Sequence, residues 1–366
     1  MLMLGSEVME KQLLEAFLEA LRELPDVQAE FGGVEHPGGA DLGHDAQVEL
    51  HAGGKAATLL IQVKKAVYPR DVRQALWQNR ESARKRLELV EGRRPSFVLV
   101  AQSISPGAKE LLRNERVGYY DSGGSLFLTV ASIYVYVDKP PPKSLSRYIR
   151  SLFSGRRAQV LHAVLVRDRE WFGVKEIANR ARVSPATVSQ VLTELERLDW
   201  VVSRGHGPGK ERHLQEPGAL LDAWVNQLTV MRPLSMRRYF VPSARAEGLV
   251  EKFAEVCVAS KAEYAITHEA AGQRYAPFLS TVSQVRCRLL DGPAADRALG
   301  ALDARFVDQG ANLTVINVRS SDELLFREFV NGIWLASAVQ VYLDLMRSEG
   351  RAKDMANHLR HERIGF

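Results

Sequence analysis

Three polar residues on one predicted hairpin have the types and the spacing of a metal-dependent hydrolytic site. Asp45 begins the first strand, the chain turns at Gly53-Gly54, and Gln62 and Lys64 stand at the end of the second strand. Two oxygen ligands on neighbouring strands can hold Mg²⁺, and a nearby lysine can stabilise charge or help to activate the attacking water. The pattern therefore predicts a candidate magnesium site on this hairpin.

The second ligand of this candidate site is an amide, because position 62 carries glutamine. An amide oxygen is neutral and binds magnesium less strongly than a carboxylate. Glu19 on the first predicted helix and Gln74 on the next are candidates to complete the site. The alternative is structural: Asp45 is then a carboxylate at the start of a strand, and Lys64 belongs to a strand that emerges into solvent.

A second group of residues lies in the middle of the chain, on three predicted helices. Apolar spacing predicts helices over 158–166 and 174–181, and a third from Pro185 to about Leu198. Ser184 is a good N-cap for the third helix, because its hydroxyl can accept from a free backbone N–H. Pro185 suits the first helical position, where its missing N–H costs nothing.

The third predicted helix has one apolar side and one small, polar side. The apolar side faces the core and consists of Val188, Val191, Leu192, Leu195 and Leu198. Small, hydrogen-bonding side chains on the other side suit a helix that lies in the major groove of double-stranded DNA. The predicted base-reading residues are Ser184, Ala186, Thr187, Ser189, Gln190 and Thr193.

Two short predicted strands, 200–204 and 211–214, follow this helix and pair across a glycine-rich loop. This hairpin is the wing of a winged helix-turn-helix, so the module is predicted to span residues 156–228. Basic residues in a wing suit contact with phosphates or the minor groove. Here they are Arg204, His206, Lys210 and Arg212. Winged helices also bind other proteins, and that alternative stays open.

A basic, proline-rich stretch precedes the module. Consecutive prolines favour an extended conformation, so residues 139–155 are predicted to be a linker after a first domain, 1–138. The stretch from 139 to 157 contains no acidic residue, and its basic residues are Lys139, Lys143, Arg147, Arg150, Arg156 and Arg157. It either follows a phosphate backbone or is a solvated linker. Arg156 and Arg157 join the candidate DNA contacts.

Length and composition predict a soluble protein of several domains. The chain has 366 residues, of which 46% are hydrophobic and 25% charged, with a net charge of +5. Its two cysteines, Cys257 and Cys287, are too few for a disulfide framework or a cysteine zinc site. There is no secretion signal and no apolar run of membrane-spanning length, so a cytoplasmic protein without a membrane partner is predicted.

The flanking regions predict an α/β (α+β) multidomain fold. Residues 1–138 contain helices and a mixed sheet, and residues 229–366 alternate helices and strands. In this last domain, His268 is predicted to cap a helix, and residues 320–323 are predicted to be a loop. An apolar stripe at Val339, Tyr342, Leu343 and Met346 predicts a core-facing helix or a docking face for a dimer or a partner protein.

The hairpin site and its surroundings resemble the PD-(D/E)xK restriction-endonuclease-like fold, whose αβββαβ core carries an Asp and a Glu/Gln-x-Lys pair around a divalent metal. Longer segments, including IQVKK at 61–65 and SAVQVYLDLMRSEGRAKDMANHLR at 337–360, are similar to AbiEi-type antitoxins of type IV toxin-antitoxin systems. This resemblance implies a homodimeric autorepressor that neutralises a cognate toxin and keeps the nuclease-like fold for binding, without a cofactor. The alternative is a Mg²⁺-dependent DNA nuclease that its winged helix delivers to DNA.

Overall fold

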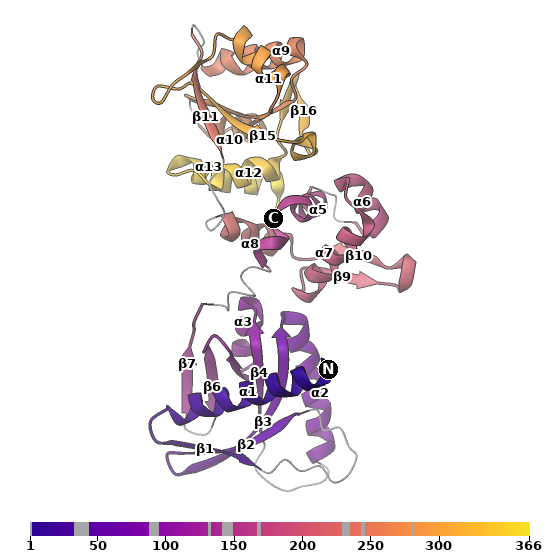
Figure 1. Ribbon diagram of the computed structural model, residues 1–366, viewed down its shortest axis with the longest axis vertical. Helices are drawn as coiled ribbons and strands as arrows, with labels where there is room; N and C mark the ends of the chain where they lie inside the picture. Colours follow the sequence, from indigo (N-terminus) through magenta and orange to yellow (C-terminus); the bar gives the residue numbers. More distant parts are fainter. Residues whose placement is uncertain are drawn as a thin grey trace. The chain divides into compact units, whose positions relative to one another are not determined.

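The computed structural model describes residues 2–32, 44–87, 95–130, 133–140, 149–166, 170–228, 235–242, 246–279 and 281–366. The chain forms two compact units, Met1–Ser151 with Glu194–Asp199 and Leu152–Thr193 with Trp200–Phe366 (Figure 1). Helices and mixed sheets in both units confirm the predicted α/β multidomain class. The linker residues Lys143 and Arg147 lie outside the described residues. No helix in the described part of the chain is both long and apolar enough to cross a membrane.

A seven-stranded sheet in the order β1 to β7 forms the centre of the first unit. Its strands are β1 (Val27–Gly32), β2 (Ala46–Ala52), β3 (Lys55–Val67), β4 (Ser96–Ile104), β5 (Gly118–Asp121), β6 (Leu126–Val130) and β7 (Ile133–Val137). The pairs β3–β4 and β4–β5 are parallel and the others antiparallel. The predicted hairpin is present as β2 and β3. Strand β1 was not predicted, although its apolar Val27, Ala29 and Phe31 alternate with polar Gln28 and Glu30 as in a half-buried strand.

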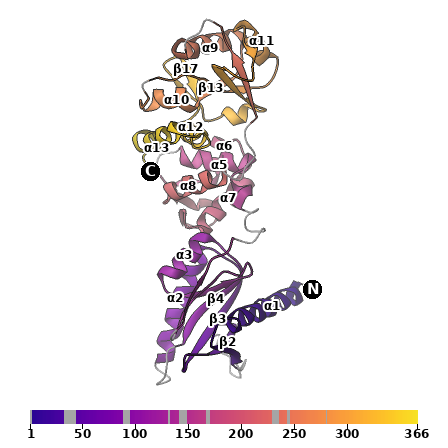
Figure 2. The ribbon, with the colours of Figure 1, turned by 90° about the vertical axis from the view of Figure 1, so that its left-hand side faces the viewer.

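Helices cover both faces of this sheet (Figure 2). α1 (Leu2–Arg22) packs on one face through an apolar stripe in which Phe17 and Leu21 are fully buried. α2 (Pro69–Leu87) and α3 (Pro106–Asn114) pack on the other face. These two helices are the crossovers that the parallel pairs require, since parallel strands cannot be joined by a tight turn.

The second unit begins with a small helical module. Its elements are α5 (Gly155–Leu165), β8 (Phe172–Gly173), α6 (Val174–Ala181), α7 (Pro185–Arg197), β9 (Val201–Arg204), η1 (Gly207–Gly209), β10 (Glu211–Leu214) and α8 (Pro217–Leu228). The division into units assigns α7 to this unit as far as Thr193 and its last residues, from Glu194, to the first unit. The three strands form a sheet in the order β8-β10-β9. Each helix and wing strand predicted between 158 and 214 is present, in the order of a winged helix-turn-helix.

The rest of the unit is built on a second seven-stranded sheet, in the order β14-β11-β15-β13-β12-β17-β16. Its strands are β11 (Met236–Phe240), β12 (Tyr264–Thr267), β13 (Val285–Leu290), β14 (Arg305–Phe306), β15 (Leu313–Val318), β16 (Glu328–Val330) and β17 (Ile333–Leu335). The helices are α9 (Ala246–Ser260), α10 (His268–Tyr275), α11 (Pro293–Ala301), η2 (Ser321–Leu324), α12 (Ala338–Met346), α13 (Arg351–Leu359) and η3 (Arg360–Ile364). Strand β11 was missed by the sequence analysis, because only Tyr239 in it is buried. The predicted loop at 320–323 is largely a single 3-10 turn capped by Ser320.

His268 does not cap α10 as predicted. It stands between β12 and the body of α10 with a left-handed φ of 53°, and its side chain is 1% exposed. Neither ring nitrogen has a hydrogen-bond partner within the described chain. Burial lowers the pKa of His268 to about 4, so the ring is neutral at neutral pH.

A buried ion pair joins α12 to the middle of the second sheet. Asp344 accepts from Arg288 through both oxygens, with Nη2–Oδ1 at 2.6 Å and Nε–Oδ2 at 3.0 Å. Thr267 and Gln340 also donate to this carboxylate, at 2.6 and 2.9 Å. The Arg288 guanidinium and the hydrogen bond from Thr267 outweigh desolvation and lower the pKa of Asp344 to about 2.

We expect Asp344→Ala to lower the free energy of unfolding by about 3–5 kcal/mol, because it leaves the Arg288 charge buried and unpaired. Urea denaturation followed by circular dichroism measures this loss. The control is Asp303→Ala, which breaks an exposed pair with Arg305 and should cost less than about 1 kcal/mol. Because folding lowers the pKa of Asp344, its contribution is present above about pH 4 and is lost as the pH falls towards 2. Equal losses for the two variants would contradict this account.

Candidate nucleic-acid interface

The turn between α6 and α7 has the geometry that its residues predict. Arg182 adopts a left-handed conformation with φ 50°, and the backbone N–H of Val183 bonds to the Ala178 carbonyl at 3.0 Å. The Ser184 hydroxyl then accepts from the backbone N–H of Thr187 at 3.3 Å, as an N-cap does. These local bonds fix the direction in which α7 leaves the turn.

Helix α7 is buried on one side and exposed on the other. Its buried apolar residues are Val188, Val191, Leu192 and Leu195, while Leu198, which follows the helix, is only half-buried. The predicted base-reading residues lie on the opposite side: Ser184, Ala186, Gln190 and Thr193 are exposed, and Thr187 and Ser189 are half-buried. From Pro185 to Thr193 this helix contains no acidic residue, so its open side presents no negative charge to a polyanion.

Some polar groups on the exposed side of α7 already have hydrogen-bond partners within the protein, and others do not. The Ser184 and Thr187 hydroxyls bond to each other at 3.0 Å, and the Thr193 hydroxyl donates to the Ser189 carbonyl at 2.9 Å. The Gln190 amide makes no hydrogen bond within the described chain. An amide that donates and accepts side by side matches the major-groove edge of adenine.

The wing is the antiparallel pair β9 and β10, joined by the loop at residues 205–210. Gly205 has φ 73°, and a Cβ there would lie 3.1 Å from the Gly209 carbonyl oxygen, so this position requires glycine. His206 is exposed on the loop and Lys210 is half-buried. Both therefore remain candidates for contact with a phosphate.

Two of the predicted DNA-contacting residues of the wing, Arg204 and Arg212, are engaged or buried within the module. The Arg204 guanidinium pairs with Glu211 at 2.8 Å and lies 4.3 Å from the ring centroid of Trp171. Arg212 is 5% exposed, because strand β10 lies between β8 and β9 and turns this side chain inward. The prediction of Arg212 as a DNA contact is therefore withdrawn. Sequence analysis missed Trp171, since only the pairing of β8 with β10 brings it beside Arg204.

Arg156 and Arg157 lie in the first turn of α5, where Arg156 is exposed and Arg157 half-buried. Positive side chains at a helix N-terminus oppose the helix dipole and reduce helix stability slightly. Helix stability therefore does not explain two arginines at this place. Both arginines stay predicted DNA contacts.

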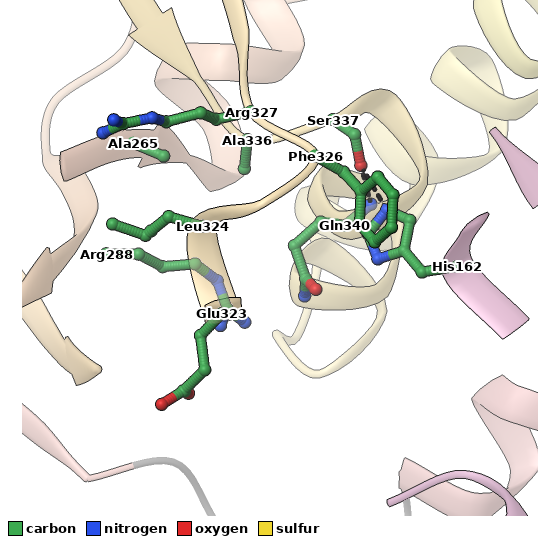
Figure 3. Close-up of a pocket in the computed structure, with 10 residues that line it drawn as sticks. All are labelled: His162, Ala265, Arg288, Glu323, Leu324, Phe326, Arg327, Ala336, Ser337 and Gln340. Carbon is green, nitrogen blue, oxygen red and sulfur yellow. Dashed lines mark hydrogen bonds between the residues drawn. The ribbon is translucent and has the colours of Figure 1, made fainter. Parts of the chain in front are cut away.

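Helix α5 also connects the winged helix to the C-terminal sheet (Figure 3). The His162 ring bonds to the Ser337 hydroxyl at 2.6 Å and stacks on Phe326 with centroids 4.5 Å apart. Burial lowers the pKa of His162 to about 3 and keeps the ring neutral. The adjoining cavity has a volume of about 20 Å³, which suits a single water-sized molecule. The contact between α5 and the C-terminal sheet is therefore tightly packed and leaves no room for a larger ligand.

The hairpin residues lie close together in the first unit. The backbone N–H of Asp45 bonds to the Ile61 carbonyl and its carboxylate accepts from the Val63 N–H, both at 2.7 Å, so Asp45 lies opposite Gln62. Ile61 and Val63 pack under α1, which places Gln62 and Lys64 on the other face.

This hairpin offers few oxygen ligands for a metal ion. One Asp45 oxygen is engaged by the backbone, and the Gln62 amide oxygen is buried without a hydrogen-bond partner in the described chain. Glu19 lies on α1 and so on the opposite face, while Gln74 is exposed on α2. No group of three or more His, Cys, Asp or Glu residues is arranged for a metal among the residues described. One carboxylate and one amide do not fit a typical magnesium site.

No protein-family model, curated protein or solved structure matches this chain. Its fold defines a multidomain α/β protein, in which α5 to α8 and the strands between them follow the element order of a winged helix-turn-helix.

Proposed function

We propose that this protein is a double-stranded DNA-binding transcriptional regulator that reads its target with α7 and its wing. The main support for the proposal is that α7 has one buried side and one exposed side. Its buried apolar side anchors the helix, and its acid-free side, with Gln190 at the centre, is open to solvent. A helix of this kind fits the major groove, where base edges can be read.

The charged residues have different roles in this proposal. Arg156, His206 and Lys210 contact phosphates and set the register of the protein on the duplex. Arg204 supports the wing through Glu211 and Trp171 in the free protein. Base selection then comes from Gln190, with small Ala186 allowing the helix to approach the groove closely.

The regulatory role rests on the resemblance to AbiEi-type antitoxins. We propose that the protein is a homodimer that represses its own operon, and that a cognate nucleotidyltransferase-like toxin is its protein partner. The nuclease-like first unit then serves binding, in agreement with the poor ligand set around Gln62. A cytoplasmic location follows from this role.

A gel-shift titration with the protein's own promoter DNA and with random duplex, at two salt concentrations, tests the proposal. We expect the promoter to bind more tightly and both complexes to weaken with salt, because phosphate contacts release counterions. Absence of duplex binding at low salt would favour the alternative in which the winged helix binds proteins.

We expect Gln190→Ala to reduce discrimination between the promoter and random duplex by about 1–3 kcal/mol, because the variant loses a bidentate contact to a base. Fluorescence anisotropy with both duplexes measures this difference. Gln12→Ala, at an exposed glutamine on α1, is the control and should leave both affinities unchanged. Equal weakening on both duplexes would assign Gln190 to the phosphate backbone instead.

We expect Glu211→Gln to tighten binding to all duplexes several-fold. The amide keeps a hydrogen bond to Arg204 but no longer neutralises its charge, which frees the guanidinium for a phosphate. One added phosphate contact steepens the slope of log affinity against log salt by about 0.9. Glu110→Gln, at an exposed glutamate on α3, controls for net charge. An unchanged slope would show that the Arg204 side chain keeps its contacts within the wing and gains none with a phosphate.

The second candidate function is a metal-dependent DNA nuclease, which the alignment of Asp45, Gln62 and Lys64 on one hairpin favours. Plasmid incubated with the protein and Mg²⁺ or Mn²⁺ tests it, with Lys64→Ala as the variant and Lys55→Ala, at the other end of β3, as the control. We expect no cleavage by any of the three proteins. Cleavage by the wild type and the control that is lost in Lys64→Ala would replace the proposal of a binding-only domain.

A further inference from the structure

Strand β7 is an edge of the first sheet and is unusually apolar for an edge. Among the strands that the structure describes, it pairs only with β6. Its sequence is Ile-Tyr-Val-Tyr-Val, without a charge, a proline or a glycine. Proteins commonly protect exposed edges with lysine, proline or bulges, because an open edge pairs with other chains.

The exposed side chains on β7 are large. Tyr134 is 73% exposed, Tyr136 43% and Val137 38%. The opposite edge of the same sheet is different, because β1 exposes Glu30 and ends at Gly32. Both edges expose an aromatic side chain, since Phe31 on β1 is 44% exposed, but β1 also carries a charged residue and β7 carries none.

Strand β7 is also complementary to itself. Antiparallel pairing of two copies centred on Val135 places Tyr134 opposite Tyr136 and Ile133 opposite Val137. Tyr134 and Tyr136 lie on one face, where both contact the Phe127 ring edge-on, whereas Ile133 and Val135 pack against the core under α1. Each face of one copy therefore continues into the same face of the other, with aromatic opposite aromatic and aliphatic opposite aliphatic.

The tyrosines are partly held in place before pairing. The Arg113 guanidinium from α3 lies 4.8 Å from the Tyr136 ring centroid and donates to its hydroxyl. An ordered aromatic side chain loses less conformational freedom on association.

We propose that β7 is the dimer interface of this protein, with two copies joined by antiparallel β7 strands around a two-fold axis at Val135. The two sheets then form one continuous fourteen-stranded sheet, since each contributes seven strands. This inference specifies the surface of the homodimer proposed above and does not depend on DNA binding.

The position on the two-fold axis allows a charge-swap test, because Val135 of one copy then pairs with Val135 of the other copy. Light scattering after gel filtration, without DNA, should give about 82 kDa for the wild type, twice the 40.8 kDa of one chain. Val135→Lys and Val135→Glu should each weaken the dimer at least ten-fold, since like charges then face each other. An equimolar mixture of the two variants should restore the dimer. Trp77→Lys, at an exposed residue of α2, should stay dimeric.

A disulfide test gives an independent result if the charged variants fold poorly. Residues opposite each other in an antiparallel pair have Cα atoms about 4.5–5.5 Å apart, within the range of a disulfide. Val135→Cys should therefore form a covalent dimer under mild oxidation with diamide. Phe31→Cys on β1 should not, and the two natural cysteines are buried.

Two results would overturn the inference. One is a wild type that is monomeric at tens of micromolar, and the other is a dimer that persists in both charged variants with no cross-link at position 135. A monomer that still binds its promoter would contradict this inference and the proposed homodimer but not the proposed DNA binding, whereas a dimer that binds no duplex would contradict only the proposed DNA binding.

Discussion

The candidate interface depends on the burial of one side of α7. Four apolar side chains of this helix, Val188, Val191, Leu192 and Leu195, are buried. Because a helix repeats every 3.6 residues, burying this stripe turns Gln190 and its neighbours towards solvent. The same core therefore stabilises the module and orients the side chains that are available to a ligand.

Contacts between strands arrange the wing. Strand β10 pairs with β8 on one side and β9 on the other, and this places Trp171, Arg204 and Glu211 together. An arginine that lies on an aromatic ring and pairs with a carboxylate has little freedom to move. The pairing of the strands thus determines which charged side chains of the wing are exposed. Arg212 is buried for the same reason, because it lies on the central strand.

Buried polar groups link the winged helix to the rest of its unit. His162 on α5 bonds to Ser337 at the start of α12, and about two helical turns further along α12 Asp344 holds Arg288 on β13. Such groups are costly to bury unless they find partners, so each bond specifies one arrangement of helix and sheet. His268 is the exception in this region, since its ring has no partner within the described chain.

The sequence by itself determined the class of fold, the helices between 158 and 198, the paired wing strands and the polar side of α7. These features follow from periodicity, caps and turns, which depend on residues close together in the chain. Only the tertiary structure decided that Arg212 is buried, that Trp171 supports Arg204, that β1 and β11 join their sheets, and that β7 is an open edge. Each of these depends on which distant strands pair, and the apolar pattern of a single short strand does not specify its neighbours.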